Sequence, residues 1–430
     1  MSSRSMIVVW PILCGIAAAQ APTYFQGAIA IERPQLVYGN DVGDPWIRIF
    51  YCLFTRKVRF RATGDFADAA PLDSSLAFRS IPVSSRIFER IESGDRAIDP
   101  LYPSFLTALG TERLFEEPRY SEFVKASADA LEQKTQRSPA ARALFESDLW
   151  AAYDLIFQHR DRIEGERPER LLTLLARMIR KVALTAEEAR RLPDNYTAGV
   201  KNGTLPDLYS ERSPWIEVVW HDGRLHDSGA NYRRSTRIFL RPAPNVKDRQ
   251  EFLESFREHN GPHAPLEAVA LVTRSLLIDN RGALTGAGIS TEVQTREFSY
   301  GSDGHVIKTG ISDFELSRKA LVTAPSSSGL VSQNESAPAY LAAFGNDYTF
   351  ASPIGAADGR QRELAILGSL RARCAGCHGP NSVALFTFNA HDNHEGTIRI
   401  LDKSKDEHAQ YVIERKTALE SWKSLAARWR

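Results

Sequence analysis

Two cysteines and a histidine near the C-terminus show the clearest chemical spacing in this chain. Residues 374–378 read Cys-Ala-Gly-Cys-His, which is the pattern C-x-x-C-H. Two thiols separated by two residues can add across the two vinyl groups of one haem, and the adjacent imidazole can then bind the iron. The spacing therefore predicts one covalently attached haem c, held by Cys374 and Cys377, with His378 as the proximal iron ligand.

The same residues also allow other chemistry. The two thiols can form a structural disulfide or a C-x-x-C redox pair, neither of which needs His378. A zinc site would need a fourth ligand, and His391 or His394 would be available for it. A motif that holds no haem is a further alternative.

On this motif, the tail from about residue 350 to residue 430 resembles the c-type cytochromes. The resemblance implies covalent haem, iron ligation by His378 and electron-transfer chemistry. Single-haem members usually take a methionine downstream of the motif as the second axial ligand. This chain has Met1, Met6 and Met178 and no methionine after His378. The sixth ligand is therefore expected to be a histidine or to be absent.

His391 and His394 are the candidate distal ligands. They lie in a polar loop between two predicted strands, and a hairpin of about a dozen residues, at roughly 3.3 Å per residue, can bring its tip to the distal face of the iron. The alternative is that both are solvated loop histidines. His408, in the first turn of the last predicted helix, is a third candidate.

The N-terminus has the order of a secretory signal peptide. Arg4 precedes an apolar run over residues 6–16, and alanines follow at 17–19, which predicts a signal peptide over residues 1–19. The run is short for a bilayer core of about 30 Å, and Pro11 interrupts it. No later stretch reaches the length of a membrane-spanning helix. We therefore expect an exported protein, periplasmic or secreted, without an integral membrane segment after signal cleavage.

Residues 20–340 are predicted to form an α+β region of unknown function. Helices are expected from the proline at position 139, from the proline at 168, and after a capping box at 185 and 188. One more helix is expected around positions 252 and 256. Alternating or apolar runs predict strands over residues 47–54, 58–61, 216–220, 237–240, 269–278 and 289–298. The Ser- and Pro-rich stretch 324–338 is interpreted as an exposed loop or linker.

The tail is predicted to form a small, mostly α-helical cytochrome c-like haem domain over residues 350–430. A helix is expected over 364–370, leading into Cys374, with short strands over 381–389 and 397–401. The last helix is expected to begin at a capping box of Ser404 and Glu407 and to continue to residue 429. Trp422 and Leu425 are expected to pack against the 364–370 helix.

Composition narrows the class of protein. The chain has 430 residues, 43% hydrophobic and 25% charged, which is typical of a folded globular protein. A net charge of +1 gives no global field for nucleic acid or an anionic membrane. Cys52, in an apolar run, is interpreted as a buried small hydrophobe. The histidine pairs at 221 and 226 and at 259 and 263 are interpreted as polar loop residues.

The leading prediction is an exported mono-haem c-type cytochrome protein of α+β class that exchanges electrons with an unidentified redox partner. A first alternative is a haem enzyme, peroxidase-like, with an open coordination site. A second alternative is a surface binding module that carries a tethered haem. The ligand state of the iron discriminates transfer from catalysis, because an open site permits catalysis.

Overall fold

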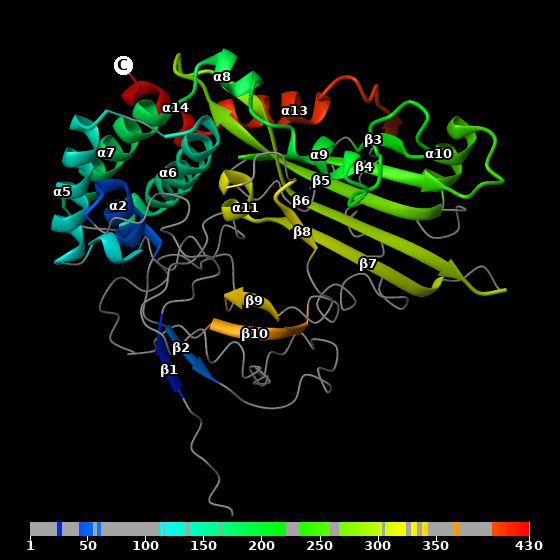
Figure 1. Ribbon diagram of the computed structural model, residues 1–430, viewed down its shortest axis with the longest axis horizontal. Helices are drawn as coiled ribbons and strands as arrows, with labels where there is room; N and C mark the ends of the chain where they lie inside the picture. Colours follow the sequence, from blue (N-terminus) through cyan, green and yellow to red (C-terminus); the bar gives the residue numbers. More distant parts are fainter. Residues whose placement is uncertain are drawn as a thin grey trace, which may run out of the picture.

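Figure 1 shows a computed structural model of the whole chain. The structure describes residues 24–27, 43–54, 58–61, 112–115, 117–134, 137–162, 165–220, 233–258, 266–302, 306–323, 328–332, 338–342, 364–369 and 398–429.

Helices and strands alternate in blocks along the chain. The helices are α2 (Pro45–Phe54), α5 (Arg119–Glu132), α6 (Pro139–His159), α7 (Arg167–Val182), α8 (Ala186–Arg190), α9 (Asn195–Lys201), α10 (Arg249–Glu258), α11 (Arg318–Thr323), α13 (Glu407–Ala418) and α14 (Glu420–Arg428), with 3-10 turns η2 (Glu112–Phe115) and η3 (Arg160–Arg162). The strands are β1 (Tyr24–Gly27), β2 (Val58–Arg61), β3 (Ile216–Trp220), β4 (Arg234–Pro242), β5 (Leu266–Ile278), β6 (Leu284–Tyr300), β7 (Val306–Leu316), β8 (Leu330–Ser332), β9 (Pro338–Ala342), β10 (Leu364–Ser369) and β11 (Ile398–Ile400).

A seven-stranded antiparallel sheet is the largest element of the fold. Its strand order is β11-β3-β4-β5-β6-β7-β8, and the strand that closes one edge, β11, comes from the tail. A four-stranded sheet of order β1-β2-β10-β9 accompanies it. The chain is therefore a mixed α+β protein, as the sequence predicted.

The two faces of the large sheet bury different side chains. In β4, Phe239 belongs to the large core shared with the helices, whereas its neighbours Ile238 and Leu240 belong to a second cluster with Phe252 and Leu253 of α10. This division follows from the period of two along a strand, which sends successive side chains to opposite faces. Both faces of the sheet are therefore covered at β4.

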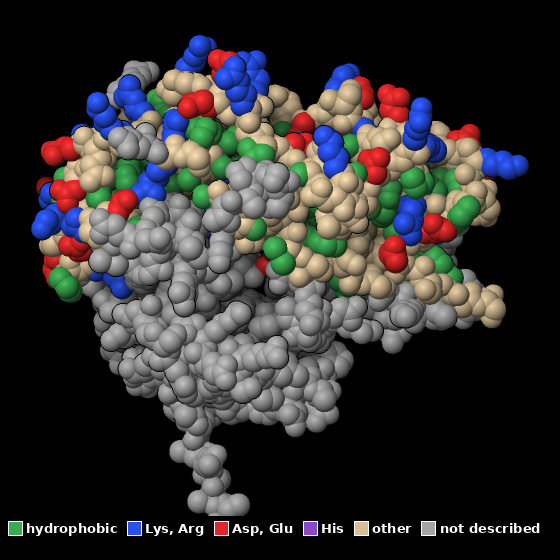
Figure 2. Space-filling view, in the orientation of Figure 1, with side chains coloured by type: hydrophobic (Ala, Val, Ile, Leu, Met, Phe, Trp, Pro, Cys, Tyr) green, Lys and Arg blue, Asp and Glu red, His purple; other side chains and the backbone are tan. Residues whose placement is uncertain are grey.

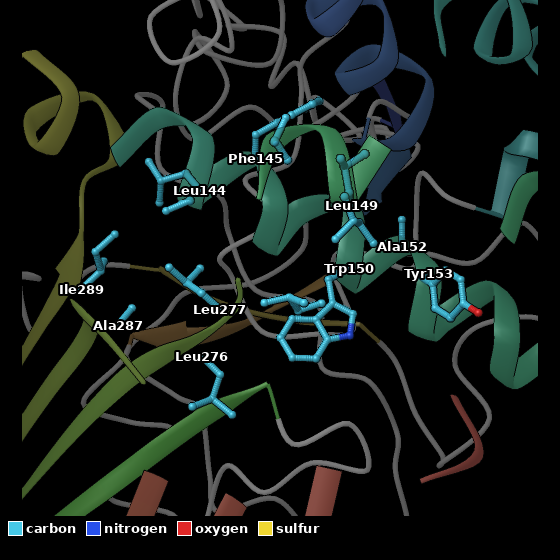
Figure 3. Packing of buried hydrophobic residues seen from close by; sticks show 14 of the residues in the cluster. Leu144, Phe145, Leu149, Trp150, Ala152, Tyr153, Leu276, Leu277, Ala287 and Ile289 are labelled. Atoms are coloured by element: carbon cyan, nitrogen blue, oxygen red, sulfur yellow. The ribbon is translucent and has the colours of Figure 1, made fainter. Parts of the chain in front are cut away.

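Helix α6 is the centre of the helical part. Its Trp150 side chain lies beside Leu277 of β5 (Figure 3), and the helix also contacts α7, α11 and α14. Its first turn begins where the sequence predicted, because the Ser138 side chain accepts a hydrogen bond from the Ala141 backbone N–H at 3.3 Å. A helix enclosed in this way is apolar around most of its circumference.

Several other elements confirm the sequence predictions. The stripe of α7 is fully buried, and Thr185 and Glu188 form the predicted capping box of α8. Strands β2, β3, β4, β5, β6 and β11 and helix α10 also occupy predicted positions. Strand β7 and helices α9 and α11 had no specific prediction.

The predicted strand over residues 47–54 is wrong, because this segment is helix α2. Asp44 accepts a hydrogen bond from the Trp46 backbone N–H at 2.8 Å, and Pro45 follows at the first helical position. The apolar run is eight residues long, and a run of this length does not separate a buried helix from a buried strand by periodicity alone.

Two further expectations are corrected, one in each sheet. Residues 364–369 form strand β10 and not a helix, and they pair with β9 and β2. Part of the predicted 324–338 linker forms β8, which pairs with β7 after Gly329 turns the chain at a φ of +62°. A Cβ at Gly329 would lie 3.1 Å from the Leu321 backbone nitrogen, so both the turn and the packing favour glycine.

The end of the tail also differs from the prediction in detail. The N-cap of α13 is Asp406 and not Ser404. The Asp406 side chain accepts a hydrogen bond from the Ala409 backbone N–H at 2.9 Å. Leu419 adopts an extended backbone and divides the expected single helix into α13 and α14.

The tail helices pack into the core of the large region. The indoles of Trp150 and Trp422 lie 6.0 Å apart between ring centroids. Tyr153 donates a hydrogen bond to Ser424 Oγ at 2.9 Å, and Leu425 is fully buried. The prediction that Trp422 and Leu425 pack on a 364–370 helix is therefore wrong. Side chains of α13 and α14 belong to the same core as α6 and α7.

Replacing Leu425 by alanine should destabilise the whole core. Truncating a fully buried leucine costs about 2–5 kcal/mol, because buried methylenes are lost and a cavity is left. Chemical denaturation should show this loss in the main cooperative transition. Ala427→Ser, at an exposed position of the same helix, is the control and should have little effect. A loss confined to a separate minor transition, with the main one unchanged, would contradict the shared core.

Candidate functional site

The haem-attachment residues predicted from the sequence lie outside the described residues. They are Cys374, Cys377 and His378, together with His391 and His394. In the chain they fall between β10 and β11. Because β10 belongs to the four-stranded sheet and β11 to the edge of the seven-stranded sheet, the structure defines the elements from which this segment departs and to which it returns.

His408 is described, and it is not placed to bind iron. Its side chain is buried, and its Nε2 atom lies 3.1 Å from the carbonyl oxygen of Val218 in β3. A carbonyl only accepts, so Nε2 carries the proton and donates. Burial lowers the pKa of His408 to about 4, which keeps the imidazole neutral near pH 7. The third candidate ligand is therefore excluded.

His408 belongs to a group of polar side chains that we call the Arg237 cluster: Glu217, Arg237, Tyr209, Lys403 and His408. Arg237 donates to Glu217 through Nε at 2.7 Å and through Nη2 at 2.5 Å, and both side chains are buried. Its Nη2 also donates to the Lys403 carbonyl oxygen at 2.8 Å, and its guanidinium lies 4.3 Å from the centre of the Tyr209 ring. The cluster thus joins β3 and β4 to the start of the tail.

The acid–base properties of this cluster favour a structural role. Burial raises the pKa of Glu217, and the two hydrogen bonds from Arg237 oppose that shift. Burial also raises the pKa of Tyr209 to about 12. Because the guanidinium is matched to the carboxylate in a two-point pair, removing either partner would leave a buried charge, at a cost of about 3–5 kcal/mol.

A second group, which we call the Asp154 cluster, lies on α6: Asp154, Lys416, Arg233 and Trp150. Lys416 Nζ of α13 is 2.7 Å from Asp154 Oδ2, and both side chains have no exposed surface. Arg233 Nε is 3.7 Å from the same oxygen. Lys416 Nζ also lies 4.8 Å from the centre of the Trp150 ring. This cluster joins α6 to the tail a second time.

A third buried pair connects α6 to α11. Arg318 Nη2 donates to Asp148 Oδ2 at 2.5 Å, with both side chains almost fully buried. Burial raises the pKa of Asp148, and Arg318 opposes that shift. Glu146, also on α6, is buried and accepts a hydrogen bond from the Ile278 backbone N–H at 2.5 Å. One helix therefore carries three buried carboxyl groups, each directed to a different element.

Sequence analysis missed these three carboxyl groups, although a signal was present. Acidic residues at 146, 148 and 154 interrupt a helix whose other residues are mostly apolar, and buried acids require partners. Their partners could not be assigned, because residues 233, 318 and 416 are remote in sequence.

The structure places two sulfur-containing residues discussed in the sequence analysis, Cys52 and Met178. Cys52 is buried in α2, and burial raises the pKa of its thiol to about 12, so it is an inert core residue. Met178 has no exposed surface and lies in the core stripe of α7. Both side chains belong to the hydrophobic core of the described residues.

The other histidines considered from the sequence, at positions 221, 226, 259 and 263, lie outside the described residues. Within the described ranges, no group of three or more His, Cys, Asp and Glu side chains is arranged to hold a metal ion. No helix in the described part of the chain has both the length and the apolar character to cross a membrane.

Charged side chains of both signs are interspersed over the face of the described surface seen in Figure 2. This distribution agrees with the near-zero net charge.

Comparison with known proteins does not assign a family. No protein-family model matches the chain, and neither the curated proteins nor the solved structures give a match.

Protonation of His408 should make stability depend on pH. The pKa of this buried imidazole is lowered from 6.5 to about 4, so the unfolded chain binds more protons between these values. Its contribution is full above pH 6.5 and is lost as pH falls toward 4, by roughly 3 kcal/mol. Urea denaturation between pH 4.5 and 7 should show a flatter profile for His408→Gln, which keeps a donor for the Val218 carbonyl but does not titrate.

The control for this prediction is Gln410→Ala, an exposed neighbour on α13, whose profile should run parallel to wild type. The assignment is contradicted when His408→Gln also runs parallel to wild type over the whole range.

Proposed function

We propose that this protein is an exported mono-haem c-type cytochrome protein that binds haem covalently and transfers electrons. The observation that carries the proposal is the sequence Cys-Ala-Gly-Cys-His at 374–378. In this proposal Cys374 and Cys377 form the thioether bonds, and His378 is the proximal ligand of the iron. The bound haem would supply one-electron redox chemistry.

Export is part of the same proposal. The N-terminal segment over residues 1–19 has the order of a secretory signal. Thioether attachment to this motif requires free thiols and a haem delivered outside the cytoplasm. A periplasmic or secreted location, with an electron-exchange partner that is itself exported, is consistent with both features.

The cytochrome c-like unit is proposed in a modified form. We retain a haem-binding unit within residues 350–430, but its helices α13 and α14 are shared with the core of the large region. The haem-bearing segment between β10 and β11 would then be an insertion into the α+β fold. In such an arrangement, the large region would supply part of the surface that surrounds the haem.

The buried positions of Met178 and His408 support an iron without a methionine ligand. Met178 has no exposed surface in the α7 core, and His408 donates to Val218. With no methionine after the motif, a His–Met iron is not expected. The proposal is a low-potential iron that is either bis-histidine, through His391 or His394, or open on the distal side, since an imidazole in place of a thioether lowers the potential.

Covalent attachment is tested by denaturation. Haem should remain on the wild-type chain after denaturation and acid–acetone extraction, because thioether bonds survive both, and it should give a haem-linked peroxidase stain on the gel. The double variant Cys374→Ala/Cys377→Ala should lose the stain. Cys52→Ala, which removes a buried cysteine outside the motif, should keep it. An unstained wild-type band from cells with a haem-attachment system would contradict the proposal.

The sixth ligand is tested by spectroscopy and carbon monoxide binding. When His391 or His394 is the ligand, its replacement by alanine should give a reduced protein that binds carbon monoxide readily. When neither ligates, reduced wild type should bind it already, the result that would favour an enzymatic role. Met178→Leu is the control and should leave the spectrum unchanged. A long-wavelength methionine–iron charge-transfer band in the oxidised wild type would exclude both states.

A further inference from the structure

The charges of the Asp154 cluster do not balance among its own members. Lys416 Nζ and Arg233 Nε both approach the same oxygen, Asp154 Oδ2, at 2.7 Å and 3.7 Å. A further carboxylate, Asp148, also acts electrostatically on Arg233, but it is itself paired with Arg318 at 2.5 Å. The cluster thus sets two cations against one carboxylate in a part of the core where Asp154 and Lys416 have no exposed surface.

Among the described residues, three buried polar atoms of the cluster have no hydrogen-bond partner: the acceptor Oδ1 of Asp154 and two donors. The donors are Nη1 of Arg233 and the indole Nε1 of Trp150. Both groups donate only, and neither can be satisfied by turning into an acceptor. The Arg233 side chain is 12% exposed, so water reaches it only at its margin.

An excess buried charge is costly unless it is compensated. Moving an isolated ion from water into a protein interior costs several kcal/mol even after relaxation. An unsatisfied buried donor adds about 1–3 kcal/mol. An anionic group next to Arg233 would reduce both costs, since it would neutralise the charge and accept from the free donor.

We propose that the Asp154 cluster binds one small monovalent anion at Arg233, close to Lys416. Its chemical class is a halide or a single carboxylate group. One negative charge matches the excess of one positive charge, and the small exposed surface of Arg233 favours a compact ligand. The site does not depend on haem, although a haem propionate is one source of such a carboxylate.

A bound anion at this site would add a contact between the tail and the rest of the fold. Lys416 belongs to α13, Arg233 immediately precedes β4, and Asp154 and Trp150 belong to α6. A bound anion would therefore stabilise the contact between elements that come from three separate stretches of the chain, and stability would vary with the anion present.

The test uses the full chain with sodium chloride as the probe and sodium gluconate as the bulky reference anion, at equal ionic strength. Thermal unfolding should show a saturable rise of the midpoint with chloride concentration that gluconate does not give. Arg233→Met, which removes the excess charge, should lose the chloride-specific rise. Asp154→Asn, which increases the excess, should steepen it. Lys423→Met, at a surface cation that is 58% exposed on α14, should respond like wild type.

Each result decides the proposal. Equal responses to chloride and gluconate in wild type would overturn it, in favour of a bridging water or a neutral Lys416. A chloride-specific rise that persists in Arg233→Met would overturn it as well. Should Arg233→Met fail to fold, line broadening of the chloride NMR signal in wild type that gluconate does not reduce supports the site, and absence of broadening in wild type overturns it.

A further comparison identifies the source of the anionic group. The same titration is made on the Cys374→Ala/Cys377→Ala chain. A chloride-specific rise in both chains assigns the site to a free anion. A rise confined to the double variant supports the site and assigns its occupant in the haem-loaded chain to a propionate. Haem staining of the same samples reports separately on the attachment of haem.

Discussion

The buried ion pair between Asp154 of α6 and Lys416 of α13 is the contact on which the placement of the tail depends. Its atoms are 2.7 Å apart and neither side chain is exposed, so breaking it would leave a buried charge and cost about 3–5 kcal/mol. Such a pair adds little net stability compared with an apolar contact, but it penalises any packing in which the two groups are not opposite one another. Together with Trp150 and Trp422, it fixes the tail helices against the centre of the helical part.

The Arg237 cluster performs the corresponding task at the sheet. Arg237 binds Glu217 in β3 at two points and also the backbone of Lys403, so the strand pair and the start of the tail are held by one guanidinium. Arginine suits this position because its planar fork can satisfy a carboxylate and a carbonyl together. The proposed haem segment consequently leads into elements that are anchored at both clusters.

The elements predicted from the sequence are those whose signals are local. The caps of α6 and α8 and the stripe of α7 depend on neighbouring residues, and they agree with the structure. The apolar run at 364–369 carries no such signal, and the packing around it decides between helix and strand. The run at 47–54 follows a local helix-start signal, Asp44 and Pro45, that the sequence prediction did not use. The three acids of α6 were visible, but their partners depend on the tertiary fold. The chemistry of residues 374–378 stays a prediction from the sequence.

The last strand and helices complete the core, and this has a consequence for the order of folding. Lys416 lies 262 positions after Asp154, and Ser424 lies 271 positions after Tyr153. Contacts this distant slow folding, because a long loop must close before they form. The core of α6 therefore cannot be finished on a growing chain until its final residues have been made. Residues 374–378 are synthesised before that step, and therefore while the core of α6 is still incomplete.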